Sequence, residues 1–237
     1  MEDPSANREE KPSPTRRKWT LGALTAIVIG VAAALGSAGI YGTVGSSGNG
    51  VDAAATTSAG RCVANGPVAA AIEPHLTGDI AAMALRSDPE NLSQLSFNDG
   101  DGETITLADT GARLRLINLW ATWCAPCREE MPWLDTLQAE RGGDDFAVVA
   151  ISVDGGSDAK PRAFLDEIGV SRLAFYHDPT IEVFNAMRRQ GLALGLPVTL
   201  LVDDNGCVIA NMNGPAHWSS PDAFEMIDAA IAANRSR

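Results

Sequence analysis

Apolar residues along the second half of the chain fall into short continuous runs separated by polar turns. Leu114–Trp120 and Phe146–Val153 are largely apolar and of strand length, which predicts two buried strands. Val198–Val202 and Val208–Met212 flank the turn sequence Asp203–Gly206, so they predict a terminal hairpin. Because runs of this kind are buried on both faces, they predict the centre of a sheet.

Helical spacing of apolar residues separates these strands. It predicts helices over Cys124–Arg141, Asp158–Ile168, Thr180–Arg189 and Pro221–Ala233. An earlier segment, 67–86, also has helical spacing, with Pro74 expected to break it. Leu95–Phe97 and Thr104–Leu107 flank Asp99–Gly102, which predicts a hairpin. The order of elements predicts an α/β fold, a central mixed sheet flanked by helices with an N-terminal helical extension.

The first sixty residues follow a different pattern. Residues 1–18 are polar and charged, which is typical of a disordered tail. Residues 19–41 carry no charge and would span about 35 Å as a helix, enough for a transmembrane anchor. Residues 42–61 are rich in Gly, Ser, Ala and Thr and predict a flexible linker, so the folded domain is expected at 62–237.

Basic residues before the apolar segment predict its orientation. Arg16, Arg17 and Lys18 precede it, and no Lys or Arg follows until Arg61. The positive-inside rule then places the N-terminus in the cytoplasm and the domain in the periplasm, with a single-pass anchor in the inner membrane. A cleaved signal peptide, or an export signal built on the twin arginines, would send the domain to the same side.

Charge narrows the choice of partners. The formal net charge is −12, and the residues after 18 hold thirteen Lys and Arg against twenty-six Asp and Glu. Nucleic-acid binding requires a basic surface, so this balance argues against a nucleic-acid partner. An acidic surface does not itself identify the partner that is bound.

The chemistry is predicted at Trp123-Cys124-Ala125-Pro126-Cys127, which follows a buried strand and opens a helix. Two cysteines at this spacing lie close enough to form a disulfide. Cys124 is at the helix N-terminus, where unpaired N–H groups and the helix dipole stabilise a thiolate and lower the thiol pKa. We therefore expect Cys124 to attack a substrate disulfide and Cys127 to resolve the mixed disulfide.

Two other interpretations of these cysteines carry less weight. A zinc site needs a second Cys or His pair at ligand spacing, whereas Cys62 and Cys207 stand alone and the three histidines are scattered, at His75, His177 and His217. A purely structural disulfide between near neighbours at a helix start is rare. No metal and no cofactor is expected.

The Cys motif followed by Glu130-Met131-Pro132 resembles the thioredoxin-like TlpA family of membrane-tethered bacterial oxidoreductases. Gly195–Thr199 resembles the cis-proline segment of that family, and the likeness extends from about residue 93 to the end. It implies a thioredoxin-like fold with a cis Pro197 against the Cys pair. Trp123 and Leu196 would then contact an extended substrate peptide, Leu196 through its backbone. The alternative for Pro197 is a simple strand-start proline.

The position six residues before the first Cys holds a buried acid in thioredoxin, but here it is Asn118, which cannot titrate. Glu130 lies one helical turn after Cys127 and on the same face. The resemblance implies that its carboxylate handles the proton of the Cys127 thiol. A solvated glutamate, like Glu129 beside it, is an equally weighted alternative.

Cys62 and Cys207 resemble an extra cysteine pair of TlpA itself, which implies a structural disulfide. An even remainder of cysteines outside the cytoplasm also favours pairing. The alternatives are a relay that passes electrons to Cys124 and Cys127, and two free buried thiols.

The function that follows is an extracytoplasmic thiol:disulfide oxidoreductase. The resemblance implies a reductase of exported proteins, including cysteines that later bind copper or haem, recharged by a membrane thiol-electron donor. The alternatives are an oxidant like DsbA and a copper-binding assembly module like the Sco proteins. A peroxidase is a further option, but Thr122-Trp123-Cys124 does not provide a peroxidatic environment.

Overall fold

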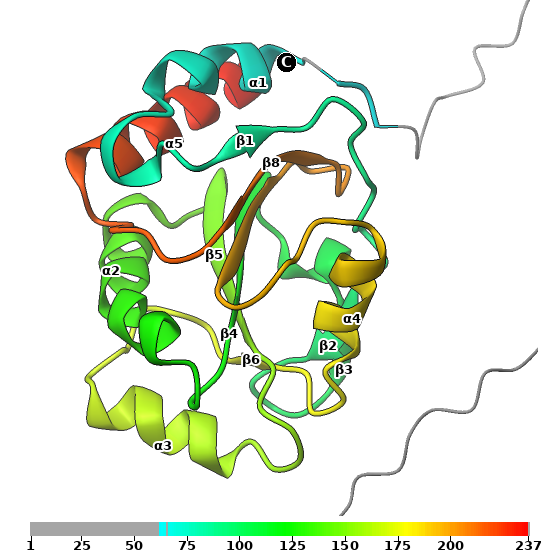
Figure 1. The fold of residues 1–237 in the computed structure, drawn as a ribbon, viewed down its shortest axis with the longest axis vertical. Coiled ribbons are helices and arrows are strands. Elements are labelled where there is room, and N and C mark those ends of the chain that lie inside the picture. Colours follow the sequence, from blue (N-terminus) through cyan, green and yellow to red (C-terminus); the bar gives the residue numbers. More distant parts are fainter. Residues whose placement is uncertain (1–61, 65, 237) are drawn as a thin grey trace, which may run out of the picture. The chain divides into compact units, whose positions relative to one another are not determined.

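The computed structural model describes residues 62–64 and 66–236. They form an eight-stranded mixed sheet in the order β1-β8-β7-β4-β5-β6-β2-β3 (Figure 1). The strands are β1 (Ala84–Leu85), β2 (Ser96–Asn98), β3 (Thr104–Thr106), β4 (Leu114–Trp120), β5 (Phe146–Ser152), β6 (Tyr176–His177), β7 (Val198–Val202) and β8 (Val208–Asn213).

The two apolar runs lie at the centre of the sheet, as predicted. β4 and β5 are parallel, in register from Leu114 opposite Phe146 to Trp120 opposite Ser152. β7 joins β4 on the other side and runs antiparallel to it. Every residue of β4 is buried, which fits a strand covered on both faces. The hairpin of β7 and β8 is also confirmed.

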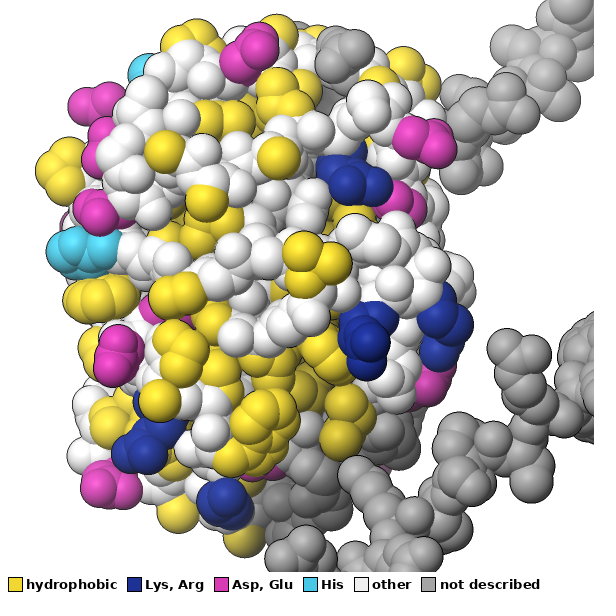
Figure 2. All heavy atoms as spheres, viewed as in Figure 1, with side chains coloured by type: hydrophobic (Ala, Val, Ile, Leu, Met, Phe, Trp, Pro, Cys, Tyr) yellow, Lys and Arg dark blue, Asp and Glu magenta, His cyan; other side chains and the backbone are white. Residues whose placement is uncertain are grey.

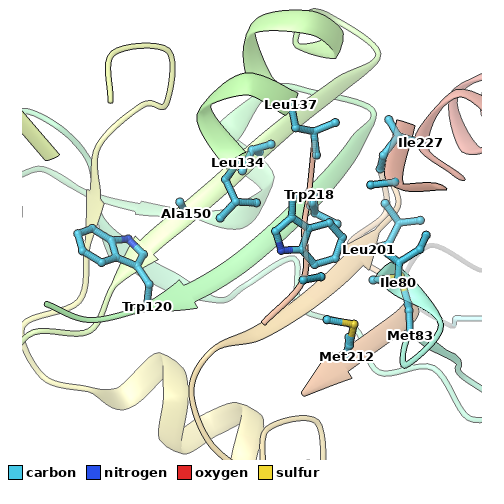
Figure 3. Close-up of a cluster of buried hydrophobic side chains, with 14 of the residues drawn as sticks. Ile80, Met83, Trp120, Leu134, Leu137, Ala150, Leu201, Met212, Trp218 and Ile227 are labelled. Carbon is cyan, nitrogen blue, oxygen red and sulfur yellow. The ribbon is translucent and has the colours of Figure 1, made fainter. Parts of the chain in front are cut away.

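Helices cover both faces of the sheet, and Figure 1 shows α2 and α4 on opposite sides. One core contains Leu116, Trp120 and Met131, together with Phe164 and Ile227 from other helices. Figure 3 shows part of this core, in which Trp218 lies among aliphatic side chains. The second core lies on the other face and includes side chains of α4. The helices are α1 (Pro67–Ile72), α2 (Ala125–Arg141), α3 (Ala159–Glu167), α4 (Glu182–Arg189) and α5 (Pro221–Arg235).

The helical pattern over 67–86 holds only at its start. α1 ends at Ile72 and a 3-10 turn, Glu73–His75, follows. Because Pro74 has no N–H to donate, it is compatible with this short turn but not with a continued helix. A second 3-10 turn spans Gly78–Ile80, and Ala84–Leu85 adds to the sheet edge as β1, paired antiparallel with β8. The sequence pattern also does not indicate β6, because its two residues are too few to show an alternation.

The predicted tail, anchor and linker at 1–18, 19–41 and 42–61 lie outside the described residues. Across 62–64 and 66–236, none of the helices has the length and apolar character needed to cross a bilayer.

Candidate active site

The Cys124–Cys127 pair lies where β4 gives way to α2, and the two sulfurs are joined in a disulfide with a Cα–Cα distance of 5.3 Å. Cys124 is the N-cap of the helix, and its sulfur accepts a hydrogen bond from the backbone N–H of Cys127 at 3.3 Å. Cys124 is 6% exposed and Cys127 is fully buried. The first sulfur is therefore the one a substrate can reach, and it lies at the positive end of the helix dipole.

Glu130 is fully buried, which excludes the alternative of a solvated helix-face glutamate for this residue. Its neighbour Glu129 is exposed, as a solvated residue would be. Glu130 Oε1 accepts a hydrogen bond from Asn118 Nδ2 at 2.7 Å. Its Oε2 accepts hydrogen bonds from the backbone N–H of Ala216 at 3.2 Å and from Trp218 Nε1 at 3.1 Å. Three donors from two segments, β4 and the segment between β8 and α5, thus converge on one carboxyl group.

Burial raises the pKa of Glu130 from 4.5 to about 7, because removal from water disfavours the charged form. The hydrogen bonds from Asn118, Ala216 and Trp218 oppose this shift, since they favour the carboxylate. A carboxyl group with a pKa near neutrality can either take up or release a proton in that range. Glu130 also lies one turn after Cys127 on the same face of α2, where a proton from the Cys127 thiol would be released.

Asn118 connects this carboxyl group to the neighbouring strand. Its Nδ2 donates to Glu130 and, at 3.0 Å, to Thr199 Oγ1 on β7. Its Oδ1 is buried and has no hydrogen-bond partner among the described residues. Asn118 therefore donates one hydrogen bond to Glu130, an arrangement that favours the ionised state of the carboxyl group.

The sequence pattern did not identify Trp218 and Ala216 as parts of this site. They lie 88 and 86 residues from Glu130 along the chain, in the segment between β8 and α5. A buried tryptophan usually has a partner for its N–H, but the sequence does not indicate which acceptor it finds. Only the fold brings that segment against α2.

The Leu196–Pro197 peptide bond is cis, the geometry that the family resemblance implied. Leu119 of β4 pairs with Val198, so Pro197 lies at the end of the sheet where β4 leads into the Cys124 loop. Two large apolar side chains near these residues in sequence are exposed. Trp123, next to Cys124, is 63% exposed, and Leu194, three residues before Pro197, is 81% exposed. Figure 2 shows hydrophobic side chains gathered on the lower half of the face between α2 and α4.

The other cysteines form a second disulfide at the opposite end of β7. Cys62 and Cys207 are bonded with a Cα–Cα distance of 5.4 Å, across 145 residues of sequence. The five residues of β7 separate Pro197 from the turn before Cys207, a length of about 16 Å. A direct electron relay would require the two disulfides to be in contact. They are instead separated by the length of this strand.

The histidines are not gathered around the Cys pair. His75 Nδ1 lies 3.6 Å from Glu225 Oε2. His217 Nδ1 lies 3.9 Å from Asp79 Oδ2, and the His217 ring packs against Trp133. His177 is buried in β6. Within the described part of the chain, no group of three or more His, Cys, Asp or Glu side chains is arranged to hold a metal ion.

The sequence is similar to those of known thiol–disulfide redox proteins. Residues 87–227 match the family described as Redoxin. The thiol-disulfide oxidoreductase ResA of Oceanobacillus iheyensis is 33% identical over 116 residues, 48% of this chain and 56% of ResA. The thiol:disulfide interchange protein HelX of Rhodobacter capsulatus is 31% identical over 134 residues, 56% of this chain and 66% of HelX.

These alignments cover only about three-fifths of the length of the relatives. A solved structure from Chlorobium tepidum, provisionally described as thiol:disulfide interchange protein DsbE, is 26% identical, with a TM-score of 0.51. That likeness covers 60% of this chain and 96% of the other. It identifies the thioredoxin-like architecture, and the family match spans more than half of the chain. This chain belongs to the Redoxin family.

Proposed function

We propose that this protein is a thiol–disulfide oxidoreductase in which Cys124 attacks and Cys127 resolves. The observation that carries the proposal is a disulfide whose first cysteine, Cys124, caps α2 and whose second, Cys127, lies one helical turn before Glu130, a buried carboxyl group with a pKa of about 7. The relatives support it, since ResA is named a thiol-disulfide oxidoreductase and HelX a thiol:disulfide interchange protein. A structural disulfide would have no need of a titratable group at that position.

In the reducing direction the reaction has two exchanges. The Cys124 thiolate attacks one sulfur of a client disulfide, a mixed disulfide forms, and the other client sulfur leaves as a thiolate. Glu130, as a carboxylate, then takes the proton of the Cys127 thiol. The Cys127 thiolate attacks Cys124 Sγ, which forms the internal disulfide and releases the second client thiolate. Two electrons pass to the client, and the structure shows the oxidised product state.

We further propose that the protein acts as a reductase on exported proteins with oxidised cysteine pairs, including those that later bind copper or haem. The resemblance to TlpA-like proteins supports this client class. The exposed side chains of Trp123 and Leu194 and the backbone of Leu196 would contact the client peptide beside Cys124. The alternatives remain an oxidant like DsbA and a copper-binding module like the Sco proteins.

Variants of the two cysteines test the mechanism. Cys124→Ser should abolish disulfide exchange, whereas Cys127→Ser should accumulate mixed disulfides, because the resolving thiol is missing. The measurement is reduction of insulin by the reduced chain, with mixed disulfides identified by mass spectrometry. Turnover by the Cys124→Ser variant would overturn the assignment of the attacking thiol.

Equilibration with glutathione buffers tests the direction. A reductase should have a potential nearer to that of thioredoxin, about −270 mV, than to that of DsbA, about −120 mV. A value near the DsbA figure would favour the oxidant. Copper titration of the reduced protein tests the Sco-like alternative, and a stoichiometric complex would support it.

We propose that the domain from 62 onward lies in the periplasm, held by an inner-membrane anchor at 19–41 and recharged by a membrane thiol-electron donor. The uncharged segment and the preceding Arg16, Arg17 and Lys18 support this topology. A second disulfide in the same chain is in keeping with an oxidising compartment. Alkaline phosphatase fused after Arg237 should be active, because it folds only outside the cytoplasm. An inactive but intact fusion would contradict the topology.

A further inference from the structure

The loop that carries Cys124 is attached to the next strand by one buried carboxylate. Thr122 donates its backbone N–H to Asp154 Oδ2 at 2.8 Å and its hydroxyl to Asp154 Oδ1 at 2.5 Å. Both residues are buried, with Asp154 only 4% exposed. Thr122 is two residues from Cys124, and the intervening Trp123 extends into solvent. Both hydrogen-bond donors of Thr122, its backbone N–H and its hydroxyl, therefore bond to the Asp154 carboxylate.

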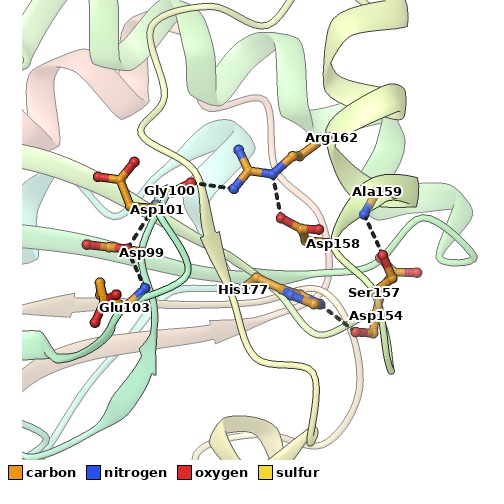
Figure 4. Close-up of polar contacts among 10 residues, drawn as sticks. All are labelled: Asp99, Gly100, Asp101, Glu103, Asp154, Ser157, Asp158, Ala159, Arg162 and His177. Carbon is orange, nitrogen blue, oxygen red and sulfur yellow. Dashed lines mark hydrogen bonds and ion pairs between the residues drawn. The ribbon is translucent and has the colours of Figure 1, made fainter.

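Asp154 is itself fixed by the ends of two parallel strands. Ser152, the last residue of β5, donates its hydroxyl to Asp154 Oδ2 at 3.1 Å. His177 of β6 bonds through Nε2 to the Asp154 carbonyl oxygen at 2.7 Å (Figure 4). The backbone N–H of Val153 donates to the carbonyl of Trp120 at 2.9 Å. Asp154 is thus bonded to the ends of β5 and β6, and its carboxylate holds the Cys124 loop there through Thr122.

We propose that Asp154 is a positioning residue for Cys124, acting through Thr122. This inference rests on the proposed function, since it requires Cys124 to be the reacting thiol. A buried carboxylate is costly unless it is hydrogen-bonded, and here its two oxygens accept three hydrogen bonds, two of them from the loop that leads to the nucleophile. Its role is to keep the Cys124 sulfur at the N-terminus of α2.

The chain contains a matched contact away from the Cys pair. Asp178 is also 4% exposed, and its Oδ1 accepts both the backbone N–H of Thr180 at 2.9 Å and the Thr180 hydroxyl at 2.5 Å. Its Oδ2 accepts the backbone N–H of Val183 at 2.7 Å. This contact fixes the loop before α4, on the other face of the sheet. Asp178 therefore offers a control of the same chemistry and burial.

Two effects of removing Asp154 differ in sign. If Asp154 positions the loop, its loss allows the Cys124 sulfur to move away from the helix N-terminus, and the pKa of the Cys124 thiol rises. If the carboxylate acts on Cys124 only through space, its loss removes a like charge and the pKa of the thiol falls. If Asp154 only stabilises the fold, its loss should resemble the loss of Asp178.

The test is the rate of alkylation of Cys124 by iodoacetamide in the reduced full-length chain, followed against pH and assigned by mass spectrometry. Asp154→Ala should slow the reaction at pH 7 by about three- to tenfold, equivalent to a thiol pKa higher by half to one unit. Asp178→Ala should leave the rate unchanged although both variants lose stability. Glu130 is retained in every variant, so its titration is common to all.

Two milder variants protect the test against unfolding. Thr122→Val removes only the hydroxyl contact, and Asp154→Asn keeps an acceptor for the Thr122 N–H. Each should therefore slow the alkylation of Cys124, but by less than Asp154→Ala does. Rates equal to that of Asp178→Ala, or faster than wild type, would overturn the positioning role. Wild-type insulin reduction is measured alongside, and its absence would refute the proposed function rather than this inference.

Discussion

The two disulfides of this chain make the same covalent bond in different surroundings. Cys124 and Cys127 are three residues apart, and the first one caps a helix at the end of the central strand β4. Cys62 and Cys207 are 145 residues apart, and Cys207 lies opposite Asn91 in an isolated antiparallel bridge. The described residues near the first pair include a buried titratable carboxyl group. The second pair joins Cys62 to a turn that backbone hydrogen bonds already hold against residues 90–92, such as Leu92 N–H to the Gly206 carbonyl at 2.7 Å.

The surroundings of a cysteine pair therefore indicate its chemistry better than the bond itself. A helix N-terminus and a nearby proton acceptor favour a thiolate that can attack and a partner that can resolve. A bond that closes a long loop mainly restricts the unfolded chain. Substitutions at the two pairs and their neighbours test this distinction, and the largest effect is expected at the second disulfide.

Removal of the second disulfide should affect stability and leave exchange intact. The chain-entropy estimate for a 145-residue loop is roughly 5 kcal/mol as an upper figure. Cys62→Ser/Cys207→Ser should therefore lower the melting temperature, measured by calorimetry, with insulin reduction largely kept. A well-folded double mutant that has lost exchange would favour the relay, and an unchanged melting temperature would show that the bond does not stabilise the fold.

Glu130 should couple stability and exchange to pH. Its pKa is raised from 4.5 to about 7, so the folded chain binds more protons than the unfolded chain between these values. Stability contributed by the neutral form is therefore present below pH 4.5 and is lost as pH rises through about 7. Glu130→Gln, which stays neutral, should remove this pH-dependent part of the stability, which amounts to about 1–3 kcal/mol between pH 4.5 and 7 in wild type.

The same variant should slow the resolving step, because Gln cannot accept the proton of Cys127. Urea unfolding at several pH values and single-turnover exchange measure the two effects. Glu129→Gln is the matched control, since Glu129 is exposed on the same helix. Equal effects of the two substitutions would make Glu130 irrelevant to the chemistry.

The smallest effect is expected from Trp218, whose N–H donates a hydrogen bond to the Glu130 carboxyl group. Trp218→Phe keeps an aromatic ring in the core but removes the N–H that donates to Glu130 Oε2 at 3.1 Å. That hydrogen bond lowers the pKa of Glu130, so its loss should shift the pKa upward, by less than about one unit. The measurement is the pH dependence of the resolving step. A downward shift would contradict the role given to Trp218.

Much of the fold could be predicted from the sequence, because the central strands β4 and β5 are continuous apolar runs and α2 follows directly from the Cys motif. The Cys pair was identifiable for the same reason: its spacing and its place at a helix start are local properties. The shortest strands could not be predicted in this way, because β1 and β6 have two residues each and depend on their partners rather than on their own pattern.

The surroundings of the site could not be predicted in the same way. Glu130 and Glu129 are adjacent and chemically identical, and only the packing of the segment that carries Ala216 and Trp218 buries one of them. The contact of Asp154 with Thr122 likewise joins residues 32 apart. Such contacts depend on which loops the fold brings together at the end of β4, and no local periodicity records them.

Labelling after a single turnover tests most directly the claim that one disulfide reacts while the other holds the fold. The chain, with only its Cys124–Cys127 bond reduced, is mixed with one equivalent of a disulfide-containing peptide, quenched with acid, and alkylated before mass spectrometry. We predict that Cys124 and Cys127 lose their thiol label together, and that Cys62 and Cys207 remain unlabelled and bonded throughout. Labelling that appears at Cys62 or Cys207 during the turnover, or thiols retained at Cys124 and Cys127 while the peptide is reduced, would contradict the account.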